Sequence, residues 1–135
     1  MTTKMIIALS GKTDEAALSG TPHEYAELAA ALERGHGRFE LVTTRDVAPY
    51  DAALRTLTVE AAETPEVRLV VDRATLDLVI RGPVRHLATL GLILRDSAES
   101  GDPEGHVHLE GFPGHEFLAE DSFPLVVHDA VEPSR

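Results

Sequence analysis

One stretch of the chain, residues 105–118, concentrates the side chains that could carry chemistry. It contains three of the seven histidines of the sequence, together with three glycines and two phenylalanines. If residues 106–110 form a strand, the alternation of side chains places His106, His108 and Glu110 on one face and Val107 and Leu109 on the other. The pattern predicts that the polar trio points away from the helices of the fold and that the apolar pair points toward them.

Three kinds of site fit such a face. Two histidines at alternate strand positions can reach one metal ion, with Glu110, His115 or His128 as a third ligand and one position open for water. A histidine beside Glu110 also suits acid–base catalysis when neighbouring groups tune it in a cleft. The third interpretation is a surface that faces a partner or solvent. We assign no catalytic, cofactor-binding or metal-binding residue and expect His106, His108, Glu110 and His115 to contact a partner.

The remaining motifs predict structure rather than chemistry. Ser122 lies in Asp-Ser-Phe and lacks the Gly-x-Ser-x-Gly context of a nucleophile elbow. Residues 11–13, Gly-Lys-Thr, lack the earlier glycine and the strand-to-helix setting of a phosphate loop. The glycines and the proline at 111–114 are typical of a turn, and Phe112 and Phe117 are expected to be anchors in the core or at its rim.

Composition excludes several classes of protein. The 135 residues carry 12 basic and 23 acidic side chains, which gives a formal net charge of −11. That charge repels phosphate backbones, so we expect no nucleic-acid partner, whereas a basic protein would be attracted. The chain has no cysteine, so it can form no disulfide, which agrees with a reducing cytoplasm. Its first apolar run is too short for the hydrophobic region of a signal peptide. With no run of membrane-spanning length, we expect a soluble cytoplasmic protein.

The first half of the chain predicts a hairpin, a capped helix and a strand. Thr21 is placed as the N-cap, Pro22 as the first helical residue, and Glu24 as the partner that completes a capping box. The predicted elements are strands at residues 4–9, 15–19 and 39–44, a helix from 22 to the glycine-bearing stop at 35–37, and a loop at 45–53.

The second half predicts three strands in close succession, a second helix and two closing strands. The connections at 63–66 and 73–74 are short enough to predict antiparallel hairpins. The broad apolar surface of the second helix, with Leu92 among its polar residues, predicts deep burial or contact in a homodimer. The predicted elements are strands at 54–62, 67–72, 75–81, 106–110 and 124–129 and a helix from 82 to about 100.

The two halves share a pattern. Residues 18–28 match residues 80–90 in a strand end, a glycine, a helix start and the same apolar positions, which indicates a strand-helix-strand unit used twice, through duplication or convergence. The predicted fold is an α+β two-layer sandwich, with two helices on one face of a mostly antiparallel sheet. We expect one domain over residues 1–135, with a loose tail at 130–135. The face opposite the helices should carry Thr58, Glu60, Arg68, Asp72, Asp77, Arg81, His106, His108, Glu110 and His128.

Several of these motifs together resemble a known family. In the first half they are Ser19-Gly20-Thr21-Pro22 and the helix positions Tyr25, Leu28 and Leu32. In the second half they are residues 106–109, Pro113-Gly114-His115, Phe117-Leu118, Ser122 and residues 125–127. With these motifs the chain resembles the small immunity proteins of bacterial polymorphic toxin systems, in particular the family numbered thirty-two.

This resemblance implies a cytoplasmic, non-enzymatic protein that binds and neutralises a cognate toxin domain. It implies no catalytic residue and no cofactor. The acidic charge agrees with it, because inhibitors of basic toxins tend to be acidic. The alternative from the residues alone is a small metal-binding or histidine-dependent enzyme that uses the face formed by His106, His108 and Glu110.

Overall fold

The computed structural model describes residues 4–43, 50–100, 102 and 104–130. Parts of three predicted segments lie outside these residues: the end of the strand at 39–44, most of the loop at 45–53, and residues 131–135 of the tail. The elements in chain order are β1 (Ile6–Leu9), β2 (Ala16–Ser19), α1 (Pro22–Arg34), β3 (His36–Glu40), β4 (Ala52–Ala53), β5 (Thr56–Ala61), β6 (Arg68–Asp72), β7 (Asp77–Gly82), α2 (Val84–Glu99), β8 (His106–Leu109) and β9 (Leu125–His128).

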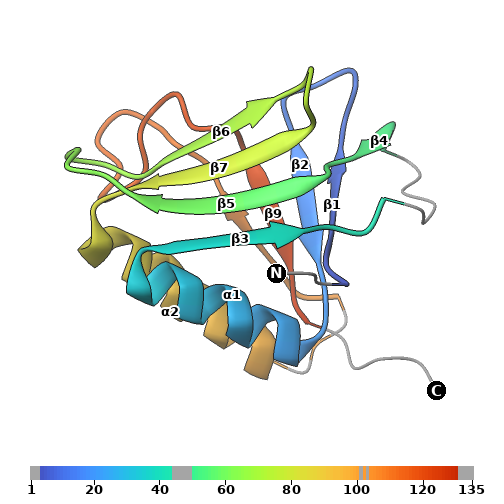
Figure 1. Ribbon diagram of the computed structural model, residues 1–135, viewed down its shortest axis with the longest axis horizontal. Coiled ribbons are helices and arrows are strands. Elements are labelled where there is room, and N and C mark those ends of the chain that lie inside the picture. The colour runs from blue at the N-terminus through green and yellow to red at the C-terminus, as the bar shows by residue number, and fades with distance from the viewer. Residues whose placement is uncertain (1–3, 44–49, 101, 103, 131–135) are drawn as a thin grey trace.

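The strands form two mixed sheets. One has the order β4-β1-β2-β9-β8 and the other β3-β5-β7-β6. Most neighbouring strands are antiparallel, but β2 and β9 are parallel, as are β5 and β7. In Figure 1 the strands of one sheet run across those of the other, and the two helices lie side by side beneath the sheets, next to β3. The predicted α+β sandwich class is confirmed, with two sheets in place of one.

The first helix shows the predicted capping chemistry. The backbone amide of Glu24 donates to Thr21 Oγ1 at 3.3 Å, and the amide of Thr21 donates to Glu24 Oε1 at 2.9 Å, which completes the capping box. Gly35 ends the helix with a φ of 86°, a left-handed conformation that glycine adopts without steric cost. These local signals were sufficient to place α1 correctly.

One predicted connection is wrong. The short segment 63–66 does not join β5 and β6 as a hairpin, because β7 lies between them and pairs with both. The sheet gains from this order, since β5 and β7 bring the buried residues Leu57, Val59, Leu78 and Ile80 together at its centre. The predicted hairpins β1–β2 and β6–β7 are present.

The internal repeat is larger than the sequence indicated. The series β1-β2-α1-β3-β5 and the series β6-β7-α2-β8-β9 have the same pairing pattern, but each sheet takes its hairpin from one half and its last two strands from the other. Helix α1 therefore carries the chain from the five-stranded to the four-stranded sheet, and α2 carries it back. The two halves are interlocked, and each sheet needs both of them.

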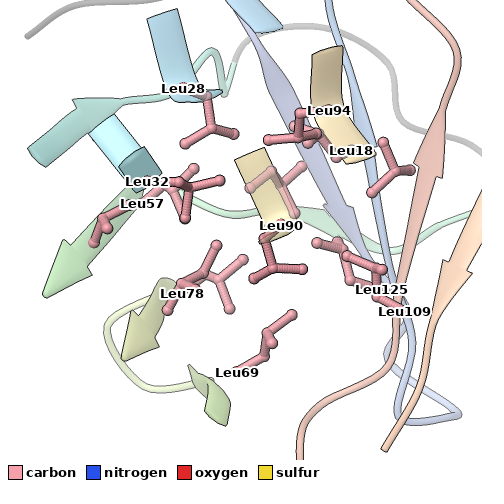
Figure 2. Close-up of a cluster of buried hydrophobic side chains, with 14 of the residues drawn as sticks. Leu18, Leu28, Leu32, Leu57, Leu69, Leu78, Leu90, Leu94, Leu109 and Leu125 are labelled. Atoms are coloured by element: carbon pink, nitrogen blue, oxygen red, sulfur yellow. The ribbon is translucent and has the colours of Figure 1, made fainter. Parts of the chain in front are cut away.

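Packing at the helix crossing follows the same symmetry. Ala29 and Gly91 occupy matching positions, and a Cβ atom on Gly91 would lie 3.1 Å from the carbonyl oxygen of Ala29. Next to the crossing, Leu28 and Leu32 of α1 lie close to Leu90 and Leu94, the matching residues of α2, as Figure 2 shows. Buried side chains of both halves join in one cluster. A cavity of about 20 Å³ at its centre has only aliphatic side chains in its lining, so we expect it to be dry.

The two-sheet arrangement divides the polar face that the sequence predicted. Thr58, Glu60, Arg68, Asp72, Asp77 and Arg81 belong to strands of the four-stranded sheet, whereas His106, His108 and His128 belong to the five-stranded sheet. The expectation of one continuous polar face is wrong, because the apolar faces of two separate sheets enclose the core. The histidines form their own surface.

Candidate functional site

Among the described strands, β8 lies at the outer edge of the five-stranded sheet, and its single pairing partner is β9. Leu109 is buried opposite Leu125, and Val107 packs against the core. His106, His108 and the following Glu110 are exposed. The predicted orientation of the strand is confirmed: its apolar side chains hold it on the core and its histidines point outward.

Three histidines lie together on this outer surface, which we call the histidine face (His106, His108 and His128). His106 pairs with His128 across the two strands. The ring centroid of His106 lies 5.0 Å from that of His108 and 6.2 Å from that of His128. His128 follows the buried residues of β9 and is exposed. The structure thus brings together three of the five side chains that the sequence singled out.

The other two do not complete a metal site in the part of the chain that is described. Among those residues, no group of three or more His, Asp or Glu side chains is arranged to hold a metal ion. Glu110 lies just beyond the end of β8, and the ring of His115 is engaged elsewhere. His106 Nδ1 instead lies 3.4 Å from the carbonyl oxygen of Glu104.

His115 organises the loop that follows β8. Its Nδ1 accepts hydrogen bonds from the backbone amides of Phe117 and Leu118, at 3.1 and 3.0 Å. Because Nδ1 is an acceptor here, a neutral His115 carries its proton on Nε2. The ring also contacts Phe112 and Phe117, with centroid distances of 4.8 Å to each. Its position in a Pro-Gly-His turn gave no signal for this supporting role.

The same loop closes the free edge of β6. The amide of Val67 donates to Phe117 O at 2.8 Å, and the amide of Ala119 donates to Val67 O at 2.7 Å. Ser122 is buried, and its hydroxyl accepts from the amide of Leu69 at 3.2 Å and donates to Val67 O at 3.4 Å. These bonds give Ser122 a structural role, in agreement with its poor sequence context for a nucleophile.

Tyr25 ties the first helix to the strand that carries His128. Its hydroxyl lies 2.5 Å from His128 O and 3.2 Å from Leu18 O, within hydrogen-bonding distance of both carbonyls. Burial raises the pKa of Tyr25 well above its ordinary range, and the nearby charges of Asp129 and Glu24 raise it further. The sequence identified Tyr25 only as one position of an apolar stripe, because the helical pattern does not show which groups its hydroxyl bonds.

In the internal repeat, strand β3 is the counterpart of β8, the strand that carries His106 and His108. Strand β3 pairs with β5 as β8 pairs with β9, so His36 and Arg38 match His106 and His108, and Glu40 matches Glu110. These three residues of β3 are exposed as well. Both edge strands therefore present alternating polar side chains outward while Phe39 or Leu109 is buried.

The candidate site is thus an exposed, histidine-bearing edge strand on a small α+β protein with a net charge of −11. In a comparison with protein families, residues 77–130 match the model of the family described as Immunity protein 32. The resemblance seen in the sequence is thereby confirmed, over a segment that runs from β7 to just beyond β9 and includes α2, the histidine strand and the loop after it. The match supports an immunity-type role.

Two further comparisons add no relatives. Neither the search of curated proteins nor the search of solved structures gave a match. Within the described residues, no helix has both the length and the apolar character needed to cross a membrane.

Proposed function

We propose that this chain is a cytoplasmic immunity protein that binds a cognate toxin domain and neutralises it without catalysing a reaction. The observation that carries the proposal is the family match over residues 77–130. The matched segment includes β8 and the 110–121 loop, where His106, His108 and Glu110 are exposed, and it does not include the hairpin of β1 and β2.

The partner-binding surface in this proposal includes His106, His108, Glu110 and His115. The first three are exposed, and His115 supports the loop from which the neighbouring side chains project. A net charge of −11 favours association with a positively charged toxin, because long-range attraction raises the rate of encounter. No described group of side chains favours the alternative of a metal-dependent enzyme.

Co-expression tests the proposal. The toxin domain encoded beside the gene of this chain should stop the growth of its host when expressed alone, and growth should return when the chain is present. The double variant His106→Ala/His108→Ala should protect less well. His23→Ala is the matched control, because His23 has a side chain that is 85% exposed on α1, outside the matched segment. Toxicity that the wild-type chain leaves unchanged would refute the proposal.

A homodimer through the second helix is a separate proposal. Leu92 is 61% exposed on α2, an unusual position for a leucine side chain. Sedimentation of the wild type and of Leu92→Glu tests it: a dimer that the substitution converts to a monomer supports the interface, and a wild-type monomer excludes it.

A further inference from the structure

The loop after the histidine strand, residues 110–121, presents an aromatic side chain to solvent. Phe112 is 55% exposed, and it is the only aromatic residue among the large exposed apolar side chains of the described residues. An exposed aromatic ring costs solubility and gives nothing to the core. Aromatic residues of this kind are enriched where one protein contacts another.

Phe112 is the outer end of a row of four rings. Its centroid lies 4.8 Å from that of His115, which lies 4.8 Å from Phe117, and Phe117 stacks on His86 of α2 at 6.2 Å. The inner rings are partly buried. These ring contacts link Phe112 through His115 and Phe117 to α2. The exposed ring of Phe112 is therefore supported by partly buried side chains.

The backbone of the loop is closed tightly. A Cβ atom on Gly111 would lie 1.9 Å from the carbonyl oxygen of Ala119, which shows how closely the two ends of the loop approach. The amides of Phe117 and Leu118 are held by His115, and Ala119 is bonded to Val67. A loop fixed in this way loses little conformational freedom when it binds.

The loop that carries Phe112 is acidic. Residues 110–121 include Glu110, Glu116, Glu120 and Asp121 and no lysine or arginine. All four carboxylates are exposed. Asp121 pairs with Arg68, whose Nε lies 2.9 Å from its Oδ1. The loop therefore combines an exposed aromatic ring with exposed carboxylates, one of which is paired with Arg68.

We infer that the 110–121 loop anchors the toxin on the partner-binding surface proposed above, and that the toxin presents arginine side chains to this loop. A planar guanidinium group stacks on an aromatic ring and forms hydrogen bonds with carboxylates at the same time, whereas a lysine ammonium makes only the point-charge contact. This inference rests on the proposed immunity function and adds to it the anchor residue and the chemistry of the partner surface.

The first test uses simple cationic probes and does not need the toxin. In NMR titrations of the full chain at physiological salt, octa-arginine should shift the amide signals of residues 110–121 and bind about threefold more tightly than octa-lysine. Phe112→Ala should abolish this preference. Equal binding of both peptides, or shifts centred elsewhere, would overturn the inference.

The second test uses the toxin domain that co-expression identifies. Phe112→Ala should weaken its binding by about tenfold or more, as expected for an interface anchor. Val70→Ala, the matched control, shortens a side chain that is 46% exposed on β6 and should change binding by less than about twofold. If the wild type binds the toxin and Phe112→Ala binds equally well, the loop assignment fails while the immunity function stands. If no toxin is neutralised, the proposed function fails, and the peptide titration still decides whether the loop prefers arginine.

Discussion

Glu33 and Arg95 occupy matching positions in the two halves of the chain, and they form an ion pair with each other. Arg95 donates from Nη2 to Glu33 Oε1 at 2.6 Å and from Nε to Glu33 Oε2 at 2.9 Å. The hydrogen bond from Arg95 lowers the pKa of Glu33 below its ordinary value, and the same bond raises the pKa of Arg95. Identical halves would place two like charges here. Opposite charges at this symmetric position favour association of two different halves within one chain.

Reversing one charge tests this relationship. Arg95→Glu should lower the melting temperature more than Arg95→Gln does, because it adds repulsion to the loss of the pair. The exchange Glu33→Arg/Arg95→Glu should recover most of the loss in thermal denaturation at low salt. An exchange variant no more stable than Arg95→Glu would contradict the pairing.

The matched leucines of the core should make similar contributions to stability. Leu28 of α1 and Leu90 of α2 occupy matching positions in the two halves and are 1% and 2% exposed. Each substitution to alanine should lower the free energy of unfolding by about 2–5 kcal/mol, measured by urea denaturation. Val70→Ala serves as the control and should change it by much less, because Val70 is 46% exposed on β6. A loss below about 1 kcal/mol at either leucine would contradict its place in the core.

Local patterns in the sequence were sufficient for the helices, the capping box and the orientation of β8. Each depends on neighbouring residues: Thr21 with Glu24, Gly35 after the helix, and the alternation from His106 to Leu109. The order of the strands in the sheets could not be predicted in the same way. The position of β7 between β5 and β6 depends on contacts between distant segments, which short connections do not reveal.

Part of the candidate site could be predicted from the sequence. Alternation predicted that His106 and His108 share an outward face, because that follows from strand geometry alone. The part of His115 in holding the loop, and the exposure of Phe112, depend on how residues 110–121 cross to β6. The acidic composition of that segment could be read from the sequence, but only the structure shows that Phe112 in the same segment is exposed.

A methyl group at Gly111 should disrupt the loop without unfolding the protein. Gly111→Ala places a Cβ atom against the backbone of Ala119, so the loop must shift away from β6. We expect faster hydrogen exchange at Val67 and Ala119, which are bonded across this contact, and a loss of toxin binding. Gly11→Ala is the control, because the atom it meets is the flexible side chain of Asp51. Unchanged exchange in Gly111→Ala would show that the loop does not need the close approach.

Tyr25 predicts how stability changes in alkaline solution. Its pKa in the folded protein is raised above the ordinary value of 10.0. Below pH ~10 the folded and the unfolded protein both keep the phenolic proton. Above pH ~10 the unfolded chain loses this proton first, because its tyrosine has the ordinary pKa. The free energy of unfolding therefore falls as the pH rises. Tyr25→Phe should cost roughly 1 kcal/mol at neutral pH, because carbonyls of Leu18 and His128 lose a donor. Its stability should decline less steeply than that of the wild type above pH ~10. Parallel declines in the two proteins would contradict the assignment.

Isothermal titration of the purified chain with the toxin domain encoded beside its gene tests the central claim most directly. The account predicts a one-to-one complex in which the toxin is inactive, with a dissociation constant that rises with salt because opposite charges guide the association. An absence of binding at micromolar concentrations, with the toxin fully active in the mixture, would contradict it.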